Sequence, residues 1–241
     1  MEDFLYPVFY AAEKEHWWFS ARQRILMNVL AMRLSPAPTK KLLDVGCGTG
    51  ALLEEFTKRF DAHGIEPSQA AVDFCRKRGL LTVKVGVLEQ HPIAEKVDIM
   101  TLLDVVEHIE DDRKLLLDAY QRISSGGFIL ITVPAYQWMW SNHDVVAHHK
   151  RRYSREGLKV LVKDAGFDII HLTHFNTLLF PVAVVKRLLT RFLHLRDREE
   201  FTVPPKLINT LLHSIFSLER TIVPAFSLPF GLSLLCLAKK A

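Results

Sequence analysis

A glycine-rich turn between an apolar run and a helical stretch constrains the fold of this chain most. The turn, Asp44-Val45-Gly46-Cys47-Gly48-Thr49-Gly50, closes a short apolar run that begins at residue 41, and residues 51–59 after it look helical. Glycine lets the backbone approach a ligand closely, and the first turn of a helix has free amide groups. We therefore predict a strand, a ligand-binding loop and a helix here.

Apolar runs and helical stretches alternate beyond this turn. The runs are continuously apolar, which is typical of a parallel sheet covered by helices on both faces. Ligands in such sheets bind at the carboxyl ends of the strands, where the glycine-rich turn lies. We expect strands at residues 61–66, 82–85, 97–103 and 128–133, and helices at residues 68–78 and 111–123.

Both flanks of this alternating region have helical character. Residues 20–34 predict a helix with Ser20 as its N-cap, and residues 135–153 look like a long loop rich in aromatic residues and histidine. A helix at 154–165, a strand at 167–175, two amphipathic helices and a last strand at 232–240 follow. We predict an N-terminal helical cap (1–38), a core (39–176 and 230–241) and a helical insertion (177–229).

Positive charge collects in the last quarter of the chain. From residue 178 onward there are nine Lys and Arg against four Asp and Glu, whereas the rest carries 22 against 23. A basic and apolar segment favours a membrane surface or an anionic lipid-like ligand over nucleic acid. The longest uncharged run, residues 221–238, is interrupted by Pro224, Pro229 and Gly231, so we do not expect it to span a bilayer.

The three cysteines indicate a reducing compartment. They are far apart and form no CxxC pair, so we expect neither a disulfide framework nor a zinc site. The N-terminus is acidic and lacks the basic start of a signal peptide. We therefore expect a cytoplasmic protein, with the inner face of the membrane as the further option.

Two kinds of cofactor site compete for the glycine-rich turn. Gly46, Gly48 and Ala51 satisfy the spacing of a dinucleotide site, which would indicate a nicotinamide or flavin enzyme. Asp44 and Gly50, however, complete the D/E-x-G-x-G-x-G pattern of class I methyltransferases. Glu66 follows Gly50 by sixteen residues and ends the next strand, where a carboxylate accepts hydrogen bonds from a ribose diol. The plainer interpretations are a turn without a ligand and a solvated acid.

Longer segments extend this pattern to a family. Residues 42–175 resemble the bacterial class I S-adenosylmethionine-dependent methyltransferases related to the ubiquinone-biosynthesis O-methyltransferases. The resemblance implies an α/β fold with a seven-stranded, mostly parallel Rossmann-like sheet and S-adenosylmethionine as cofactor. The matching segments are LLDVGCGTG, GIEPS, VDIMTLLDVVEHIEDD, SSGGFILITVPAY and HHKRRYSREGLKVLVKDAGF.

The resemblance also implies cofactor-binding residues. Glu66 would hold the ribose, Val87 and Leu88 would flank the adenine, and Asp104 would lie near the sulfonium. Many relatives have Asp where this chain has Val87, so that contact to the adenine amine is missing here. Arg22 would grip the cofactor carboxylate, or be solvated on a packed helix. The full set expected at the cofactor is Trp18, Arg22, Asp44, Gly46, Cys47, Gly48, Gly50, Glu66, Pro67, Val87, Leu88 and Asp104.

A general base is needed if the acceptor is a hydroxyl, and histidine suits this role because its pKa lies near neutrality. We expect His143 or His149 as the base and Asp104 and His108 at the pocket, and the sequence does not choose between the first two. In some ubiquinone-type enzymes an acid-x-x-Glu-His segment holds a divalent cation. We predict no metal, because similar segments are common in relatives without one.

The loop at residues 136–153 is the expected acceptor lid, or else a structural hinge. Trp138 and Trp140 would provide apolar walls, and Arg152 and Tyr153 polar handles. The insertion would form a platform for a lipid-linked acceptor or a membrane surface, or serve as core and homodimer packing.

We therefore expect an enzyme that methylates an oxygen of a small apolar or lipid-linked acceptor. The main alternative is a non-catalytic cofactor-binding regulatory or scaffold subunit. No nucleic-acid partner is expected, because the (N/D)-P-P-(Y/F) signature of amino methylation is absent after the fourth strand, where the chain reads LLDVVEH.

Overall fold

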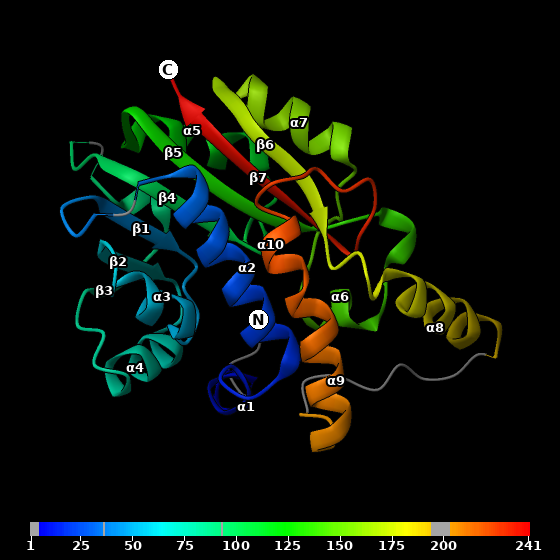
Figure 1. The fold of residues 1–241 in the computed structure, drawn as a ribbon. Coiled ribbons are helices and arrows are strands. Elements are labelled where there is room, and N and C mark those ends of the chain that lie inside the picture. The colour runs from blue at the N-terminus through cyan, green and yellow to red at the C-terminus, as the bar shows by residue number, and fades with distance from the viewer. Residues whose placement is uncertain (1–4, 36, 93, 194–202) are drawn as a thin grey trace.

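One twisted sheet forms the centre of the protein (Figure 1). The computed structural model describes residues 5–35, 37–92, 94–193 and 203–241. The seven strands of this part are ordered β3-β2-β1-β4-β5-β7-β6. They are β1 (Lys41–Val45), β2 (Asp61–Glu66), β3 (Val83–Val85), β4 (Val97–Leu103), β5 (Ile123–Pro134), β6 (Phe167–Phe175) and β7 (Ser233–Lys240).

The strand directions confirm the predicted sheet class. Strands β1 to β5 pair in parallel, and β7 lies antiparallel between β5 and β6. The chain moves outward from β1 to β2 and β3, then returns to β4 on the other side of β1. This reversal places the loops after β1 and β4 at one crevice, the usual ligand position in such sheets.

Helices cover both faces of the sheet and enclose two apolar cores. One core joins α2, α3, α4 and α9 to the sheet, and the other joins α5 and α7. The helices are α1 (Tyr6–Ala12), α2 (Trp17–Arg33), α3 (Ala51–Phe56), α4 (Gln69–Lys77), α5 (Asp112–Arg122), α6 (Asn142–Val146), α7 (Arg155–Asp164), α8 (Phe180–Phe192), α9 (Lys206–Ser217) and α10 (Glu219–Ile222).

Two predicted starts were wrong by more than one residue. Helix α2 begins at Trp17, and its N-cap is His16, whose Nδ1 accepts a hydrogen bond from the amide of Trp18 at 3.2 Å. Ser20, the predicted N-cap, lies inside the helix. The helix begins earlier because Trp17 and Trp18 pack against the core. Strand β5 begins at Ile123, five residues early, because a register shift in its pairing with β4 accommodates the intervening residues.

The expected loop at 135–153 contains short helices. These are the 3-10 turn η4 (Gln137–Met139) and α6. Another 3-10 turn, η3 (Val106–His108), follows β4. A further 3-10 turn, η2 (Leu88–Gln90), follows β3. Short helical elements thus hold part of the predicted acceptor loop, at residues 137–139 and 142–146.

The C-terminal helices attach to the rest of the protein in different ways. Asn209 of α9 accepts a hydrogen bond from the amide of Trp17 at 2.9 Å and donates to the carbonyl of Glu15 at 2.8 Å. The buried Glu219 of α10 accepts three backbone amides that follow β6. Helix α8, by contrast, has no buried residue. The first predicted amphipathic helix extends over residues 178–200, and its part from residue 194 lies outside the described residues.

Across the described ranges, every helix is too short or too polar to cross a bilayer.

Candidate active site

The glycine-rich turn connects β1 to α3 and is open to a ligand on one side. Gly50 has a φ of +85°, and a Cβ there would lie 2.7 Å from Leu80 Cδ1, so only glycine fits. Gly48 has a φ of +56°, but a Cβ on it would meet no heavy atom within 4 Å. The backbone at Gly48 is therefore available for close approach by a ligand.

Glu66 lies beside this open backbone at the end of β2. Its side chain is buried, with Oε2 accepting the amide of Gly48 at 2.9 Å and Oε1 accepting the amide of Ser68 at 3.1 Å. The Tyr6 side chain in α1 also hydrogen-bonds to it. Burial raises the pKa of Glu66, whereas the two amides lower it. A carboxylate fixed in this way next to Gly48 fits a ribose diol.

Asp44 supports the turn from below. It is 3% exposed, and its Oδ1 accepts a hydrogen bond from Thr101 Oγ1 on the neighbouring strand at 2.6 Å. Burial raises the pKa of Asp44 to about 7, although the hydrogen bond from Thr101 opposes that rise. The carboxyl group therefore gains a proton at neutral or mildly acidic pH.

This pKa predicts that Asp44 makes folding pH-dependent. The folded pKa exceeds the ordinary value of 3.8, so the neutral carboxyl contributes stability that is lost as the pH rises through about 7. We expect the free energy of unfolding in urea, without cofactor, to fall between pH 4 and pH 8 by on the order of 2–4 kcal/mol more in wild type than in Asp44→Asn. Parallel pH dependences of the two proteins would contradict this account.

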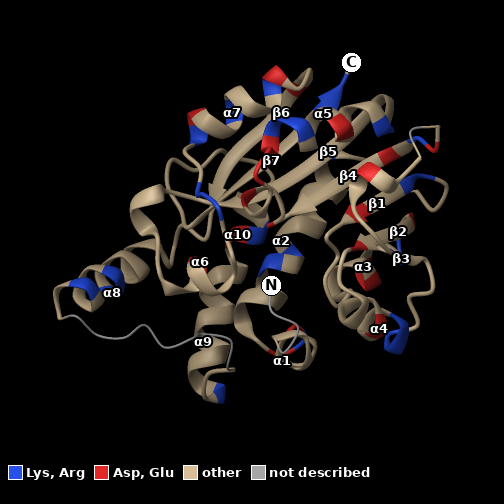
Figure 2. Ribbon diagram, turned by 180° about the vertical axis from the view of Figure 1, so that it is seen from behind, with Lys and Arg blue, Asp and Glu red and all other residues tan. Residues whose placement is uncertain are grey.

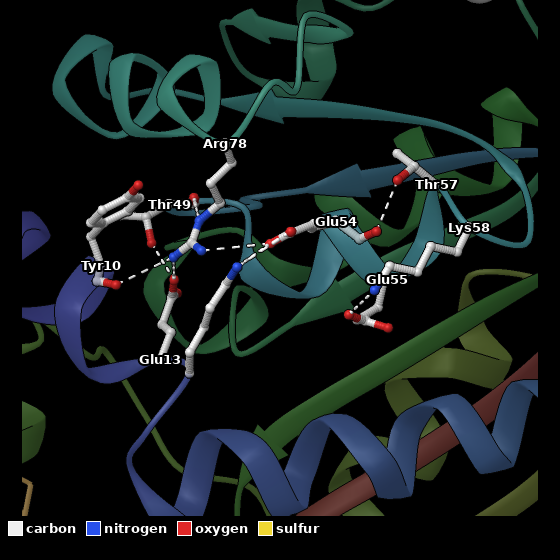
Figure 3. A network of polar contacts seen from close by, with 9 residues as sticks. Tyr10, Glu13, Thr49, Glu54, Glu55, Thr57, Lys58 and Arg78 are labelled. Atoms are coloured by element: carbon white, nitrogen blue, oxygen red, sulfur yellow. Dashed lines mark hydrogen bonds and ion pairs between the residues drawn. The ribbon is translucent and has the colours of Figure 1, made fainter.

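An ion-pair network holds the N-terminal segment on the turn (Figure 3). The Glu13 carboxylate accepts a hydrogen bond from Thr49 Oγ1 and pairs with Arg78 Nη2 at 2.8 Å. Arg78 Nε also donates to the carbonyl of Thr49 at 2.8 Å, and its guanidinium stacks on the ring of Tyr10. Residues from α1, the turn and the end of α4 thus form one buried cluster. We propose that residues 1–38 act as a cap over the cofactor.

Removal of one partner from this cluster should be costly. Arg78→Met leaves the Glu13 carboxylate buried without its cation, so we expect the free energy of unfolding to fall by about 3–5 kcal/mol. The double variant Glu13→Gln/Arg78→Met should recover part of this loss. Lys58→Met, which removes the exposed partner of Glu55, is the control and should change little. Equal effects of Arg78→Met and Lys58→Met in urea unfolding would show that the buried Glu13–Arg78 cluster does not stabilise the fold.

Arg22 and Asp104 meet at the carboxyl ends of β4 and β5. Arg22 Nη2 lies 2.7 Å from Asp104 Oδ2 and 2.9 Å from Thr132 Oγ1, and Thr132 donates to Asp104 Oδ1 at 3.0 Å. Asp104 has a φ of +58°, an uncommon conformation for a residue other than glycine. The guanidinium stacks 5.0 Å from the Trp18 ring. Arg22 thus lies at the expected edge, but it pairs with a protein carboxylate.

The other expected cofactor residues surround the same edge. Cys47 is half-buried in the turn, and Gly46 has a φ of +71°. Pro67 is exposed after Glu66. Val87 is 42% exposed and Leu88 is buried, so only the first presents its side chain to solvent. The cofactor roles of these residues remain predictions.

His149 is oriented by a buried acid, Asp144, whose role toward this histidine was not predicted from the sequence. Its Nδ1 lies 2.8 Å from Asp144 Oδ1, and the His149 side chain is 8% exposed. Asp144 is fully buried and also accepts two hydrogen bonds from Arg152, at 2.7 and 2.9 Å. Burial would raise the pKa of Asp144, but the bonds from His149 and Arg152 outweigh it and hold that pKa well below its ordinary value.

The ionised state of Asp144 fixes the tautomer of His149. An ionised carboxylate only accepts, so Nδ1 carries the proton and Nε2 carries the lone pair. His143, the other candidate base, lies exposed on α6, with its ring 5.9 Å from that of His149. His149 is thus held by a buried acid. The Asp-x4-His spacing was the signal that would have found this pair.

His149 also adjoins His108 and Glu107 from the turn after β4. The three residues place potential ligand atoms within 4.8 Å of one another, a set that would suit a divalent cation. Burial and the nearby Asp104 raise the pKa of Glu107 well above its ordinary value. Burial and His149 lower the pKa of His108 to about 4, so its ring is neutral at pH 7. The predicted absence of a metal stays a prediction.

Two of the expected acceptor residues have other contacts. Tyr153 is buried, and its hydroxyl donates to Asp112 Oδ2 at 2.6 Å, so it supports the loop, and its role at the acceptor stays a prediction. The guanidinium of Arg152 forms an ion pair with the buried Asp144. Trp138 is 46% exposed and Trp140 half-buried, and both remain candidates for apolar walls.

A family model and the curated relatives agree on one family. A family model described as "Methyltransferase domain" matches residues 17–172. A ubiquinone biosynthesis O-methyltransferase of Escherichia coli is 27% identical over 139 residues, 51% of this chain and 58% of that protein. A probable S-adenosylmethionine-dependent methyltransferase of Mycolicibacterium smegmatis is 24% identical over 65% of this chain and 61% of that protein. The chain thus spans less than two thirds of these relatives.

Solved structures match the fold over most of both chains. A SAM-dependent methyltransferase from Archaeoglobus fulgidus has a TM-score of 0.57 at 19% identity, covering 90% of this chain and 94% of that one. The N-methyltransferase NodS from Bradyrhizobium japonicum, in complex with S-adenosyl-L-homocysteine, has a TM-score of 0.55 at 12% identity, covering 91% and 86%. These likenesses concern the fold.

Proposed function

Because the chain belongs to the S-adenosylmethionine-dependent class I methyltransferases, we propose that it methylates an oxygen of a small apolar or lipid-linked acceptor. One observation carries the choice of oxygen: His149 is held by the buried, ionised Asp144 at the loop that follows β5. A hydroxyl acceptor must lose its proton during transfer, and a positioned imidazole can remove it.

The cofactor, when bound, supplies an electrophilic methyl group. Glu66 would accept hydrogen bonds from its ribose, the backbone at Gly48 would lie against it, and α1 would cover it through Tyr6. Arg22 and Asp104 would bound the pocket beyond β4. The pocket would thereby exclude water from the reacting atoms.

His149 would act at the acceptor. Nε2 takes the proton that the acceptor hydroxyl releases, and Asp144 stabilises the imidazolium that results. Trp138 and Trp140 would form apolar walls, which suits an acceptor with an apolar body. The non-catalytic alternative, a regulatory or scaffold subunit, leaves this buried acid–histidine pair without a purpose.

A transfer assay with labelled S-adenosylmethionine tests this proposal. Catechols, prenylated phenols and a matched amine series would be incubated with the full chain, and products would be located by tandem mass spectrometry. We expect methyl ethers from the phenols and none from the amines. Transfer to amines alone would contradict the proposed oxygen chemistry, and label incorporated into no acceptor class would favour the non-catalytic alternative.

A further inference from the structure

Helix α8 presents its apolar side to solvent. Its outer face consists of Val182, Val185, Leu188, Leu189, Phe192 and, just past the helix end, Leu193, and all six are exposed. Phe192 is 81% exposed and Leu188 54%. Surface helices of globular proteins normally direct such a stripe to the core, so this orientation calls for a partner.

The opposite side of α8 contacts the protein through an arginine and an aromatic ring. Arg191 Nη2 donates to the carbonyls of Trp138 and Trp140, at 2.8 and 3.1 Å. The Phe180 ring packs edge-on to Trp138 at 6.3 Å between centroids. Helix α8 is therefore fixed to the loop that would line the acceptor site, with its apolar face turned away from it.

Helix α9 adds a second exposed apolar stripe at the same end of the molecule. Leu207, Leu211 and, just past the helix end, Leu218 recur at helical spacing and are 83%, 59% and 61% exposed. In Figures 1 and 2 both helices project from the same end of the protein, away from α7. Both helices thus expose apolar side chains, Leu188 and Phe192 on α8 and Leu207 and Leu211 on α9.

The charge on these helices favours anionic lipid. Helices α8 and α9 contain Lys186, Arg187, Arg191 and Lys206 but no Asp or Glu. Figure 2 shows the basic bands on α8 and at the end of α9. Basic residues beside a broad apolar face are the composition of helices that lie in a membrane interface. A second copy would bring the same cations against themselves, because a two-fold interface is self-complementary.

We propose that the outer face of α8, with the leucine stripe of α9, docks on a bilayer that contains anionic lipids. Leu188 and Phe192 enter the interface and Lys186 faces the headgroups. Helix α8 has 13 residues and is too short to span, so it lies in the plane of the surface. Its consequence for catalysis rests on the proposed function: the acceptor loop, held by Arg191, is placed near the lipid surface that supplies the acceptor.

Vesicle sedimentation of the full chain tests this docking. The probes are phosphatidylcholine vesicles with and without phosphatidylglycerol. We expect wild type to bind the anionic vesicles about tenfold more tightly, and Lys186→Glu to lose most of that difference. Leu188→Ser/Phe192→Ser should weaken binding by about tenfold or more, because two apolar side chains no longer enter the interface. Val160→Ser, at an exposed valine on α7, is the control and should bind as wild type.

Other outcomes overturn the proposal. Equal sedimentation of wild type and Leu188→Ser/Phe192→Ser would show that this face is not the contact. A wild-type dimer in light scattering that this double variant converts to a monomer, without vesicle binding, would assign the face to a second copy. Calorimetry with S-adenosylmethionine separates the two proposals. Normal cofactor binding without vesicle binding rejects only the docking, whereas vesicle binding without cofactor binding rejects only the proposed function.

Discussion

Glu66→Ala is expected to weaken S-adenosylmethionine binding by about tenfold to a hundredfold. In the wild type the carboxylate is buried beside Gly48 and is fixed by two backbone amides, so it needs no rearrangement to accept hydrogen bonds from the ribose. The alanine variant removes this charged acceptor. Hydrogen bonds to charged groups contribute about 1.5–3 kcal/mol, which corresponds to this range. Equilibrium dialysis with labelled cofactor measures the change.

Two matched variants make this result specific. Glu66→Gln keeps the shape and one accepting oxygen, and should bind with intermediate affinity. Glu156→Ala removes an exposed acid of α7 and should bind as wild type. If Glu66→Ala binds as tightly as wild type, the ribose lies elsewhere and the assignment of the crevice fails.

His149→Ala is expected to lower kcat for a hydroxyl acceptor by about a hundredfold to ten-thousandfold, as loss of a general base does. Cofactor affinity should be unchanged, because His149 belongs to the acceptor loop. Asp144→Asn should also lower kcat, because the amide no longer stabilises the imidazolium. His143→Ala is the matched control and should retain most of the rate, since His143 is exposed and His149 is the ring held by Asp144. The reverse order of the two histidine variants would make His143 the base.

The same variants separate a base from a metal ligand. If Glu107, His108 and His149 hold a divalent cation, a chelator should abolish the activity of wild type and added Mg²⁺ should restore it. If His149 is the base, chelation should have no effect, and the rate of His149→Ala should rise with pH as the acceptor hydroxyl ionises in solution. Loss of wild-type activity on chelation would contradict the base assignment.

Local patterns predicted the sheet and the crevice. The glycine-rich turn follows one apolar run and Glu66 ends the next. The order of the strands alone therefore predicts that the two lie close together at one edge of a parallel sheet. The contacts that complete the site are not local. Glu13 reaches Thr49 and Arg78 across 36 and 65 residues, and no periodicity in the sequence indicates such pairs.

The direction in which side chains point could not be predicted from the sequence either. The pattern of residues 178–200 predicted an amphipathic helix, and its described part includes α8, but a pattern does not say which face meets the protein. The natural expectation, that the apolar side is buried, is wrong for α8, because Leu188, Leu189 and Phe192 are exposed while Arg191 bonds to the loop at residues 138–140. For Tyr153, likewise, an aromatic hydroxyl beside a functional loop proved to be bonded inward to Asp112.

Titration calorimetry of wild type with S-adenosylmethionine and with its demethylated product tests the central claim most directly. The account predicts saturable binding of both, at one site per chain and in the micromolar range that corresponds to about −8 kcal/mol. Absence of binding by either compound, from protein shown to be folded, would contradict the assignment of the Gly48–Glu66 crevice as a methyl-donor site.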